Sequence, residues 1–289
     1  MSRLTLKHVV DIDYITVEYS LSSFLMNYLE ESRGSGYVVG VSGGIDSATA
    51  LALAVRSVGP KKVFALILPD TDTTPRDDVE DAIELVEKFG IEYHIIDISR
   101  AVQIFKELIP LYSNDIADRL PLGNLRARLR MCILYYYANK LNHLVLGTGD
   151  RSEYLIGYFT KYGDGAADIA PLTILYKSQV RCFAQHLGIP NKIIRKPSAP
   201  RLWPNHLAEE ELGIKYEDID LVLTAYIDLG IPENKIPEIT SIDKEKVNKI
   251  LKLYRSSYHK RQGVIMPDTK LLITIQKKIH ENFYNQVQE

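Results

Sequence analysis

Short apolar segments alternate with longer amphipathic segments over the first half of the chain. The apolar segments are rich in β-branched residues and leucine and have the length of buried strands; they cover residues 37–41, 63–68, 92–97 and 143–147. Between them, apolar residues recur at helical spacing, which predicts helices over residues 46–58, 77–89 and 122–141. Short strands that alternate with helices indicate βαβ crossovers, so the strands are expected to form a parallel sheet.

The regions that flank this alternation are predicted to be mainly helical. Apolar spacing over residues 15–32 indicates one helix before the first strand, and two glycines are expected to end it. After Lys161 the stretch KYGDGAADIAPLT has no sustained period, and long ordered loops of this kind often carry function. A helix is expected at 176–187, and the proline-punctuated remainder is expected to be helical up to a last helix at Lys270–Tyr284.

These elements predict the α/β fold class, as a doubly wound parallel sheet flanked by helices with a helical C-terminal region. We expect a single domain over residues 1–289. Its expected parts are an N-terminal helical segment, a core that carries the sheet, and a C-terminal helical region packed on that core, over residues 1–36, 37–190 and 191–289.

Composition and charge argue against several classes of binding partner and site. The chain has 289 residues, 46% of them hydrophobic, and a formal net charge of -2 with no basic stripe, which argues against a nucleic-acid-binding protein. Cys132 and Cys182 are isolated, so neither a disulfide framework nor a zinc site is indicated. The start MSRLTLKHVV is unlike a signal peptide, and no apolar run has the length of a membrane span. We therefore expect a soluble, cytoplasmic protein that binds no membrane.

The stretch YVVGVSGGIDS at residues 37–47 is the clearest candidate site. At the carboxyl end of a parallel strand, a glycine-rich turn into a helix presents free backbone N–H groups that suit phosphate. No lysine follows the glycines as in a P-loop, and the three-glycine dinucleotide fingerprint is absent. The hydroxyls of Ser42 and Ser47 and the loop amides could hold pyrophosphate, and Asp46 could hold magnesium. An ordinary tight turn is the alternative.

The motif SGGxDS resembles the pyrophosphate loop of the adenine-nucleotide alpha hydrolases, also called N-type ATP pyrophosphatases, which cleave ATP between its α and β phosphates. Four further motifs, in order along the chain, narrow the resemblance: GNLRARLRM at 123–131, LGTGDRSE at 146–153, GYFTKYGDGAADIAPL at 157–172 and KPSA at 196–199. With HKR at 259–261, they make the chain similar to the ammonia-dependent NAD synthetases over nearly its whole length. FTKYGDG is the most specific of these matches.

This resemblance implies a Rossmann-like ATP pyrophosphatase fold and a ligase that forms a C–N bond. The expected reaction is amidation of deamido-NAD to NAD by ammonia, with ATP as co-substrate, Mg²⁺ as cofactor, a nicotinyl-adenylate intermediate, and AMP and pyrophosphate as products. The expected assembly is a homodimer. Only residues 1–36 precede the first strand, which leaves no room for a glutaminase, so the ammonia is expected to be free or delivered by a separate subunit.

The resemblance also assigns roles to individual residues. It implies that ATP is bound by Gly40, Val41, Ser42, Gly43, Gly44, Ile45, Asp46, Ser47, Thr148, Lys177 and Ser198. It implies that deamido-NAD is bound by Arg128, Lys161, Asp168, His259 and Lys260. The implied magnesium ligands are Asp46 and Glu153, and the residues expected to take part in the chemistry are Asp46, Asp168 and Lys177.

Each of these residues also has an ordinary structural interpretation. Asp46 could cap the helix beside it, Glu153 could be a solvated carboxylate at a helix start, and Lys177 could lie on a helix surface. A helix with several arginines usually presents a solvated face, so Arg126 and Arg130 are expected to be solvent-exposed or ion-paired.

Two features depart from the family pattern. The stretch PRLWPNHLAEEELG, which follows KPSA, resembles a mobile segment that covers the active site in the family. Here Leu207 and Ala208 stand where Thr and Asp are common, so the polar contacts of those two residues to substrate are not expected from this sequence. GTGDRSE also lacks an Asp-His common in bacterial members. The rival functions are a tRNA-modifying enzyme of the same superfamily, disfavoured by charge and cysteine content, and a nucleotide-binding regulatory module that has lost the reaction.

Overall fold

The computed structural model describes residues 3–268 and, beyond them, residues 270, 275–277, 279, 283 and 287. The helix predicted at Lys270–Tyr284 therefore lies for the most part outside the described residues. Among the described helices, none is both long and apolar enough to cross a lipid bilayer.

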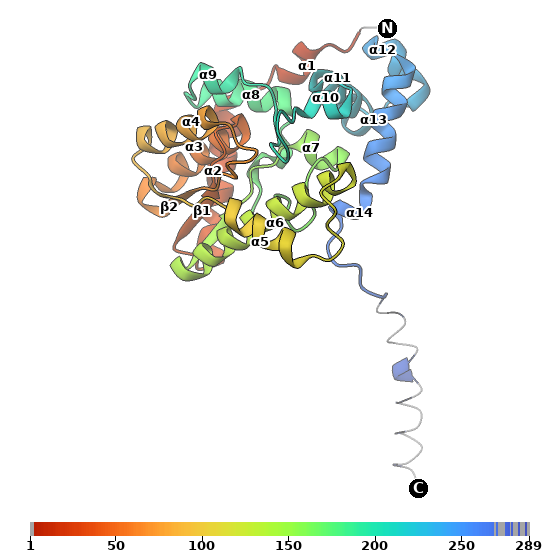
Figure 1. Cartoon of the computed structure of the whole chain (residues 1–289). Coiled ribbons are helices and arrows are strands. Elements are labelled where there is room, and N and C mark those ends of the chain that lie inside the picture. The colour runs from red at the N-terminus through yellow and green to blue at the C-terminus, as the bar shows by residue number, and fades with distance from the viewer. Residues whose placement is uncertain are drawn as a thin grey trace.

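The described strands form one parallel sheet, which lies to one side of the C-terminal helices (Figure 1). Its strand order is β3-β2-β1-β4, and the strands are β1 (Gly36–Gly40), β2 (Val63–Ile67), β3 (Glu92–Ile95) and β4 (His143–Leu146). Val39 pairs in register with Ala65 of β2 and with Leu146 of β4. Strand β1 is thus flanked on both sides by parallel strands. Its carboxyl end lies beside that of β4, so the turns after these two strands meet at one edge of the sheet.

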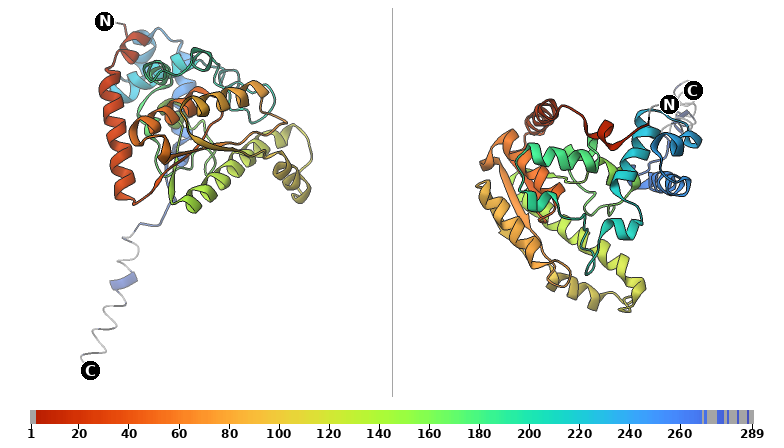
Figure 2. Two further views of the ribbon diagram at one scale, coloured as in Figure 1. Left: turned by 90° about the vertical axis from the view of Figure 1, so that its left-hand side faces the viewer. Right: turned by 90° about the horizontal axis from the view of Figure 1, so that it is seen from above.

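Helices cover both faces of the sheet, and Figures 1 and 2 show the strands between the two helical layers. Tyr37 and Val39 face one layer, whereas Val38 faces the other, because successive strand residues point in opposite directions. The first layer is formed by α2 (Tyr14–Glu31), α3 (Ile45–Val58), α4 (Arg76–Lys88) and α8 (Lys177–His186). The second is formed by α5 (Ser99–Leu108) and α6 (Arg119–Leu141). The predicted doubly wound α/β fold is confirmed.

A second hydrophobic core lies in the C-terminal helical region. Val9, Ile156 and Tyr176 join this core from earlier parts of the chain. Its main elements are α10 (Ala208–Leu212), α11 (Tyr216–Leu223), η4 (Thr224–Asp228), α12 (Ile236–Thr240) and α13 (Lys244–Ser256). The remaining elements are η1 (Pro60–Lys62), η2 (Ile116–Asp118), α7 (Arg151–Ile156), η3 (Pro171–Ile174), α9 (Asn191–Ile194), η5 (Glu233–Lys235) and α14 (Tyr258–Arg261).

The structure contains helices that the sequence pattern did not indicate. A short helix, α1 (Leu6–Val10), precedes α2, so the N-terminal segment holds two helices rather than the single one predicted. Asp13 separates them, because its side chain accepts the backbone N–H of Ile15 and starts α2. Helix α5 was also missed. Val102, Phe105 and Leu108 do recur at helical spacing there, but Val102 is the one buried residue of this helix.

Candidate active site

The glycine loop has the predicted strand–turn–helix form. It leaves the end of β1 and enters α3, whose N-cap is Gly44. Ser47 ties the loop together: its hydroxyl accepts the Ser42 N–H at 3.2 Å and donates to the Gly44 carbonyl at 3.0 Å. Gly43 has a φ of +76°, and a Cβ there would lie 2.1 Å from the carbonyl oxygen of Asp78. Only glycine fits this position.

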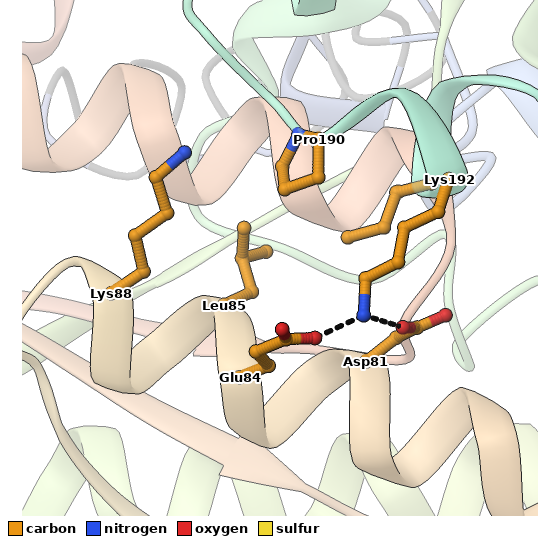
Figure 3. A pocket seen from close by; sticks show the side chains of 7 residues that line it. Asp81, Glu84, Leu85, Lys88, Pro190 and Lys192 are labelled. Atoms are coloured by element: carbon orange, nitrogen blue, oxygen red, sulfur yellow. Dashed lines mark hydrogen bonds and ion pairs between the residues drawn. The ribbon is translucent and has the colours of Figure 1, made fainter.

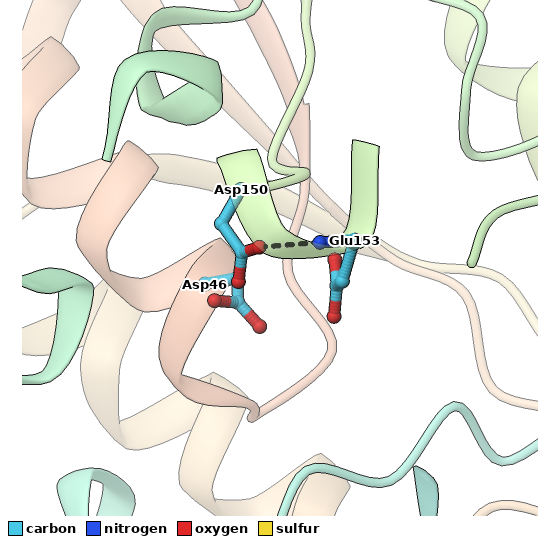
Figure 4. A group of neighbouring side chains, drawn as sticks. All are labelled: Asp46, Asp150 and Glu153. Atoms are coloured by element: carbon cyan, nitrogen blue, oxygen red, sulfur yellow. Dashed lines mark hydrogen bonds between the residues drawn. The ribbon is translucent and has the colours of Figure 1, made fainter. Parts of the chain in front are cut away.

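Three carboxylates meet where the turns after β1 and β4 come together (Figure 4). Asp46 lies in the first turn of α3, Asp150 is the N-cap of α7, and Glu153 lies in the first turn of that helix. One oxygen of each lies within 4.8 Å of the others. Asp150 also accepts the Glu153 backbone N–H at 2.9 Å, which fixes both on α7.

Lys177 lies at the centre of this acidic cluster. Its Nζ is 2.7 Å from Asp46 Oδ2, 2.7 Å from Asp150 Oδ2 and 2.8 Å from Glu153 Oε1. The side chain is 0% exposed, so the surface-lysine interpretation is wrong. Burial alone would lower the pKa of Lys177, but the attraction of Asp150, Asp46 and Glu153 outweighs it and raises the pKa well above its usual value.

The charge of this cluster suits a divalent cation. When all groups are ionised, three carboxylates and one ammonium leave two negative charges in a largely buried site. Desolvation raises the pKa of Glu153 to about 8, and the negative charges of Asp150 and Asp46 add to the rise although Lys177 opposes it, so Lys177 does not fully balance the negative charge of the cluster. Asp46 Oδ1 is buried and has no hydrogen-bond partner within the described chain. Carboxylate oxygens are the ligands Mg²⁺ prefers, so Asp46, Asp150 and Glu153 fit it.

The residues expected to bind deamido-NAD form a second group, between α6, the loop at 157–169 and α14. Arg128 of α6 donates to the Lys161 carbonyl at 3.2 Å, and Lys161 Nζ donates to the His259 carbonyl at 3.1 Å. Lys260 Nζ donates to the carbonyls of Gly157 and Phe159 at 2.8 and 2.7 Å. The structure thus brings together four of the five residues expected to bind deamido-NAD, from distant parts of the sequence, with His259 joined through its backbone carbonyl.

Asp168 is held at a different place. Its carboxylate accepts the Val145 N–H of β4 at 2.7 Å and the Tyr135 hydroxyl at 3.3 Å. Its own N–H donates to the Val145 carbonyl, so the loop runs alongside β4. Of the other predicted residues, Thr148 lies in the turn between β4 and α7, and the Ser198 carbonyl accepts the Ala208 N–H at 2.9 Å.

The segment that departs from the family pattern is attached to the body of the protein. Arg201 pairs with Asp78 at 2.9 Å, and Leu202 packs against Gly123 of α6, where a Cβ would approach it to 2.8 Å. The ring of Trp203 stacks on His206 with centroids 3.5 Å apart. This segment therefore connects the start of α4, beside the glycine loop, with α6.

A cavity of about 210 Å³ lies between α4 and α9 (Figure 3). Lys192 reaches across it and pairs with Asp81 at 2.6 Å and with Glu84. None of the predicted site residues lines this cavity, and its charged groups neutralise one another, so we do not assign it to the active site.

Sequence reasoning missed two acidic residues at the strand ends. Asp150 was not considered; the available signal was an Asp three residues before Glu153 at a helix start, which is the spacing of an N-cap. Asp70, after β2, is fully buried and pairs with Arg126 of α6. Of the two interpretations of Arg126, the ion pair is confirmed and solvent exposure is wrong, since the residue is 5% exposed. Arg130 donates to the Leu68 carbonyl at 2.8 Å.

Comparison with known proteins agrees with this geometry. The profile of the NAD synthase family matches residues 17–264. The NH(3)-dependent NAD(+) synthetase of Aeropyrum pernix is 55% identical over 266 residues, which cover 92% of this chain and 93% of the relative. Among solved structures, the NMN synthetase from Francisella tularensis has a TM-score of 0.78 at 35% identity, covering 89% of this chain and 100% of its own. The NH3-dependent NAD synthetase from Campylobacter jejuni has a TM-score of 0.73 at 28% identity, with the same two coverages. The chain therefore belongs to the NAD synthase family, as its motifs predicted.

Proposed function

We propose that the chain amidates deamido-NAD to NAD, with ammonia as nitrogen donor and ATP as the activating co-substrate. Membership of the NAD synthase family makes it a ligase that forms a C–N bond in NAD biosynthesis. The observation that best supports the finer proposal is the cluster of Asp46, Asp150, Glu153 and Lys177 beside the glycine loop. It brings three carboxylates that could hold a metal ion, a buried cation and the glycine loop proposed to bind phosphate to one edge of the sheet.

The first step would activate the nicotinate carboxylate, which is a poor acyl donor because it is negatively charged and would have to expel hydroxide. One of its oxygens attacks the α-phosphorus of ATP, a bond to AMP forms, and pyrophosphate leaves. The Ser42 and Ser47 hydroxyls and the loop amides would receive the pyrophosphate, and Lys177 would neutralise phosphate charge. Mg²⁺, when bound by Asp46, Asp150 and Glu153, supplies further positive charge against the ATP phosphates.

In the second step, the ammonia nitrogen attacks the acyl carbon of the nicotinyl-adenylate, AMP leaves with the electron pair of the C–O bond, and the nitrogen loses a proton. Asp168 would orient the substrate or accept that proton. We favour the orienting role, because its carboxylate already accepts the Val145 N–H and the Tyr135 hydroxyl. Most of the rate would come from positioning and charge neutralisation.

The cationic group formed by Arg128, Lys161, His259 and Lys260 would bind the anionic deamido-NAD. We also propose a cytoplasmic homodimer. Exposed apolar side chains between the end of α5 and the start of α6 support the dimer, because contiguous exposed apolar surface is typical of interfaces. These side chains are Leu108, Leu111, Ile116 and Leu120.

A second candidate substrate is nicotinate mononucleotide, because the Francisella tularensis relative of 35% identity is an NMN synthetase. Both acids present the same nicotinate carboxylate and differ in the AMP half of deamido-NAD. The chemistry of the acidic cluster is the same for both, so the choice depends on residues that bind the rest of the substrate.

The test is an end-point assay of the purified protein with MgATP and either acid, comparing ammonium with glutamine, and measuring amide product, AMP and pyrophosphate separately. The proposal expects all three products with deamido-NAD and ammonium, and little with glutamine. AMP and pyrophosphate without NAD would point to a different acceptor or nucleophile. Faster turnover of nicotinate mononucleotide than of deamido-NAD would make the mononucleotide the preferred substrate. Absence of ATP cleavage would favour the alternative of a nucleotide-binding regulatory module that has lost the reaction.

A further inference from the structure

Two short segments carry Glu153 and Lys177 of the acidic cluster. Residues 151–153 open α7 and hold Glu153, and residues 176–178 open α8 and hold Lys177. They are separated in sequence by the long loop and η3. A backbone bond joins the Arg151 N–H to the carbonyl of Leu175, just before the second segment, at 2.9 Å. Apart from this bond and the ion pair between Glu153 and Lys177 themselves, their relative position depends on what else holds these segments together.

Asp220 of α11 is bonded to both segments. One carboxylate oxygen accepts the Ser152 hydroxyl at 2.5 Å, and the other accepts the Ser178 N–H at 2.9 Å. The Ser152 oxygen in turn accepts the Lys177 N–H at 2.9 Å. Asp220 is fully buried, so water does not compete for these bonds. Ser152 and Ser178, the two residues bonded to Asp220, directly precede Glu153 and follow Lys177 in the sequence.

Tyr216, one turn earlier on the same helix, contacts the charged groups themselves. Its hydroxyl lies 3.4 Å from Glu153 Oε1, and Lys177 Nζ lies 5.0 Å from the centre of its ring. Residues four apart share one face of a helix, so Tyr216 and Asp220 point together toward the acidic cluster. The side chain is 1% exposed and excludes water from that side of the site.

Asp228 of η4 also bonds to one residue of each segment, Arg151 and Tyr176. It accepts a bond from the Arg151 guanidinium at 2.5 Å and from the Tyr176 hydroxyl at 2.8 Å. The three residues of α11 and η4 therefore each connect the α7 segment with the α8 segment. Asp228 connects 151 with 176, Asp220 connects 152 with 178, and Tyr216 connects 153 with 177.

We propose that Tyr216, Asp220 and Asp228 form a clamp that sets the spacing of Glu153 and Lys177, with Asp220 as its central positioning residue. The inference rests on the proposed function only in naming the metal as Mg²⁺. Through this clamp, α11 and η4 hold Glu153 in place relative to Lys177, and none of the three clamp residues is among those proposed to bind ATP or deamido-NAD. Loosening it should weaken cation binding selectively, because outer partners of metal ligands commonly change metal affinity by about 10–100-fold.

The test compares Asp220→Ala with Asp220→Asn, Tyr216→Phe and a control on the same helix, Asp218→Ala. Asp218 pairs with Lys246 at the surface, at 2.9 Å, and does not belong to the clamp. The probe is Mn²⁺, whose binding to each full-length variant is followed by electron paramagnetic resonance, with and without ATP. Steady-state assays give the half-saturating Mg²⁺ concentration and the KM for deamido-NAD, and thermal melting checks the folded state.

We expect the Kd for Mn²⁺ and the half-saturating Mg²⁺ concentration to rise about 10–100-fold in Asp220→Ala. Asp220→Asn should be affected less, since its amide oxygen still accepts one bond, and Tyr216→Phe should shift the Kd by a few-fold. The KM for deamido-NAD and all values for Asp218→Ala should stay near wild type. An unchanged Mn²⁺ Kd in folded Asp220→Asn and Tyr216→Phe, whatever Asp220→Ala does to stability, would overturn the clamp. If the wild type binds Mn²⁺ but makes no NAD, the proposed function fails while the clamp is still tested.

Discussion

Replacing Lys177 with methionine removes the one cation of the acidic cluster and keeps nearly the same side-chain length. In the wild type, Nζ lies within 2.8 Å of an oxygen of each of three carboxylates, and the side chain is fully buried. Removing one partner of a buried ion pair costs about 3–5 kcal/mol, because the remaining charge is left without compensation. Here three carboxylates lose their partner, so the upper part of that range applies.

The matched control is Lys246→Met. Lys246 also pairs with an aspartate, Asp218 at 2.9 Å, but its side chain is 50% exposed. Exposed pairs of this kind contribute about 0–1 kcal/mol, so this change should be nearly silent. Both variants lose one lysine, and only the burial and the number of carboxylate partners differ.

The assay is thermal unfolding in EDTA, repeated with increasing Mg²⁺. A loss of about 3–5 kcal/mol should lower the Tm of Lys177→Met by roughly 6–20 °C in EDTA. Mg²⁺ binding to the folded state should recover much of this difference, because it restores positive charge between the carboxylates. A Tm within roughly 2 °C of wild type in EDTA, equal to the control, would refute the electrostatic account of the cluster.

Three further predictions concern single positions. Gly43→Ala should raise the KM for ATP at least about tenfold, because φ is +76° and the new Cβ would meet the Asp78 carbonyl oxygen. Steady-state kinetics at varied ATP concentration measure this KM, and an unchanged value would contradict the prediction. Asp46→Asn should lower kcat by about 10²–10³-fold at saturating Mg²⁺ with little change in Tm, measured by single-turnover AMP release. Burial raises the pKa of Asp220 to about 7 in the folded state, whereas an aspartate in the unfolded chain has a pKa of about 4. Between these two pH values the folded state binds more protons than the unfolded state. The free energy of unfolding should therefore fall as the pH rises through this window. Denaturant titrations should show this slope in the wild type and a flatter one in Asp220→Asn; equal slopes would argue against the shift.

The elements of the sheet and the glycine loop could be predicted because their signals are local. The strand YVVGV, the glycine pair and the following helix are contiguous, so their geometry follows from backbone preferences. Parallel strands end at one edge, so the turns that hold Asp46 and Glu153, the magnesium ligands implied by the resemblance, lie close together. The structure bears out this proximity.

The supporting residues could not be predicted because their partners are distant in sequence. Arg126 looked like a solvated helix residue, and its buried partner Asp70 lies 56 positions earlier. Asp220 lies 68 positions after Ser152, on a helix that belongs to the second core. Tertiary packing brings each of these pairs together, and no local spacing indicates it.

The position of the acidic cluster between two hydrophobic cores has a thermodynamic consequence. Asp46 lies on α3, which packs into the core around the sheet, whereas Glu153 lies on α7, whose Ile156 belongs to the C-terminal core. A ligand that contacts both carboxylates binds only when both cores are folded and docked, so its binding free energy stabilises their association. Saturating MgATP should therefore stabilise both cores together and raise the Tm of the whole protein.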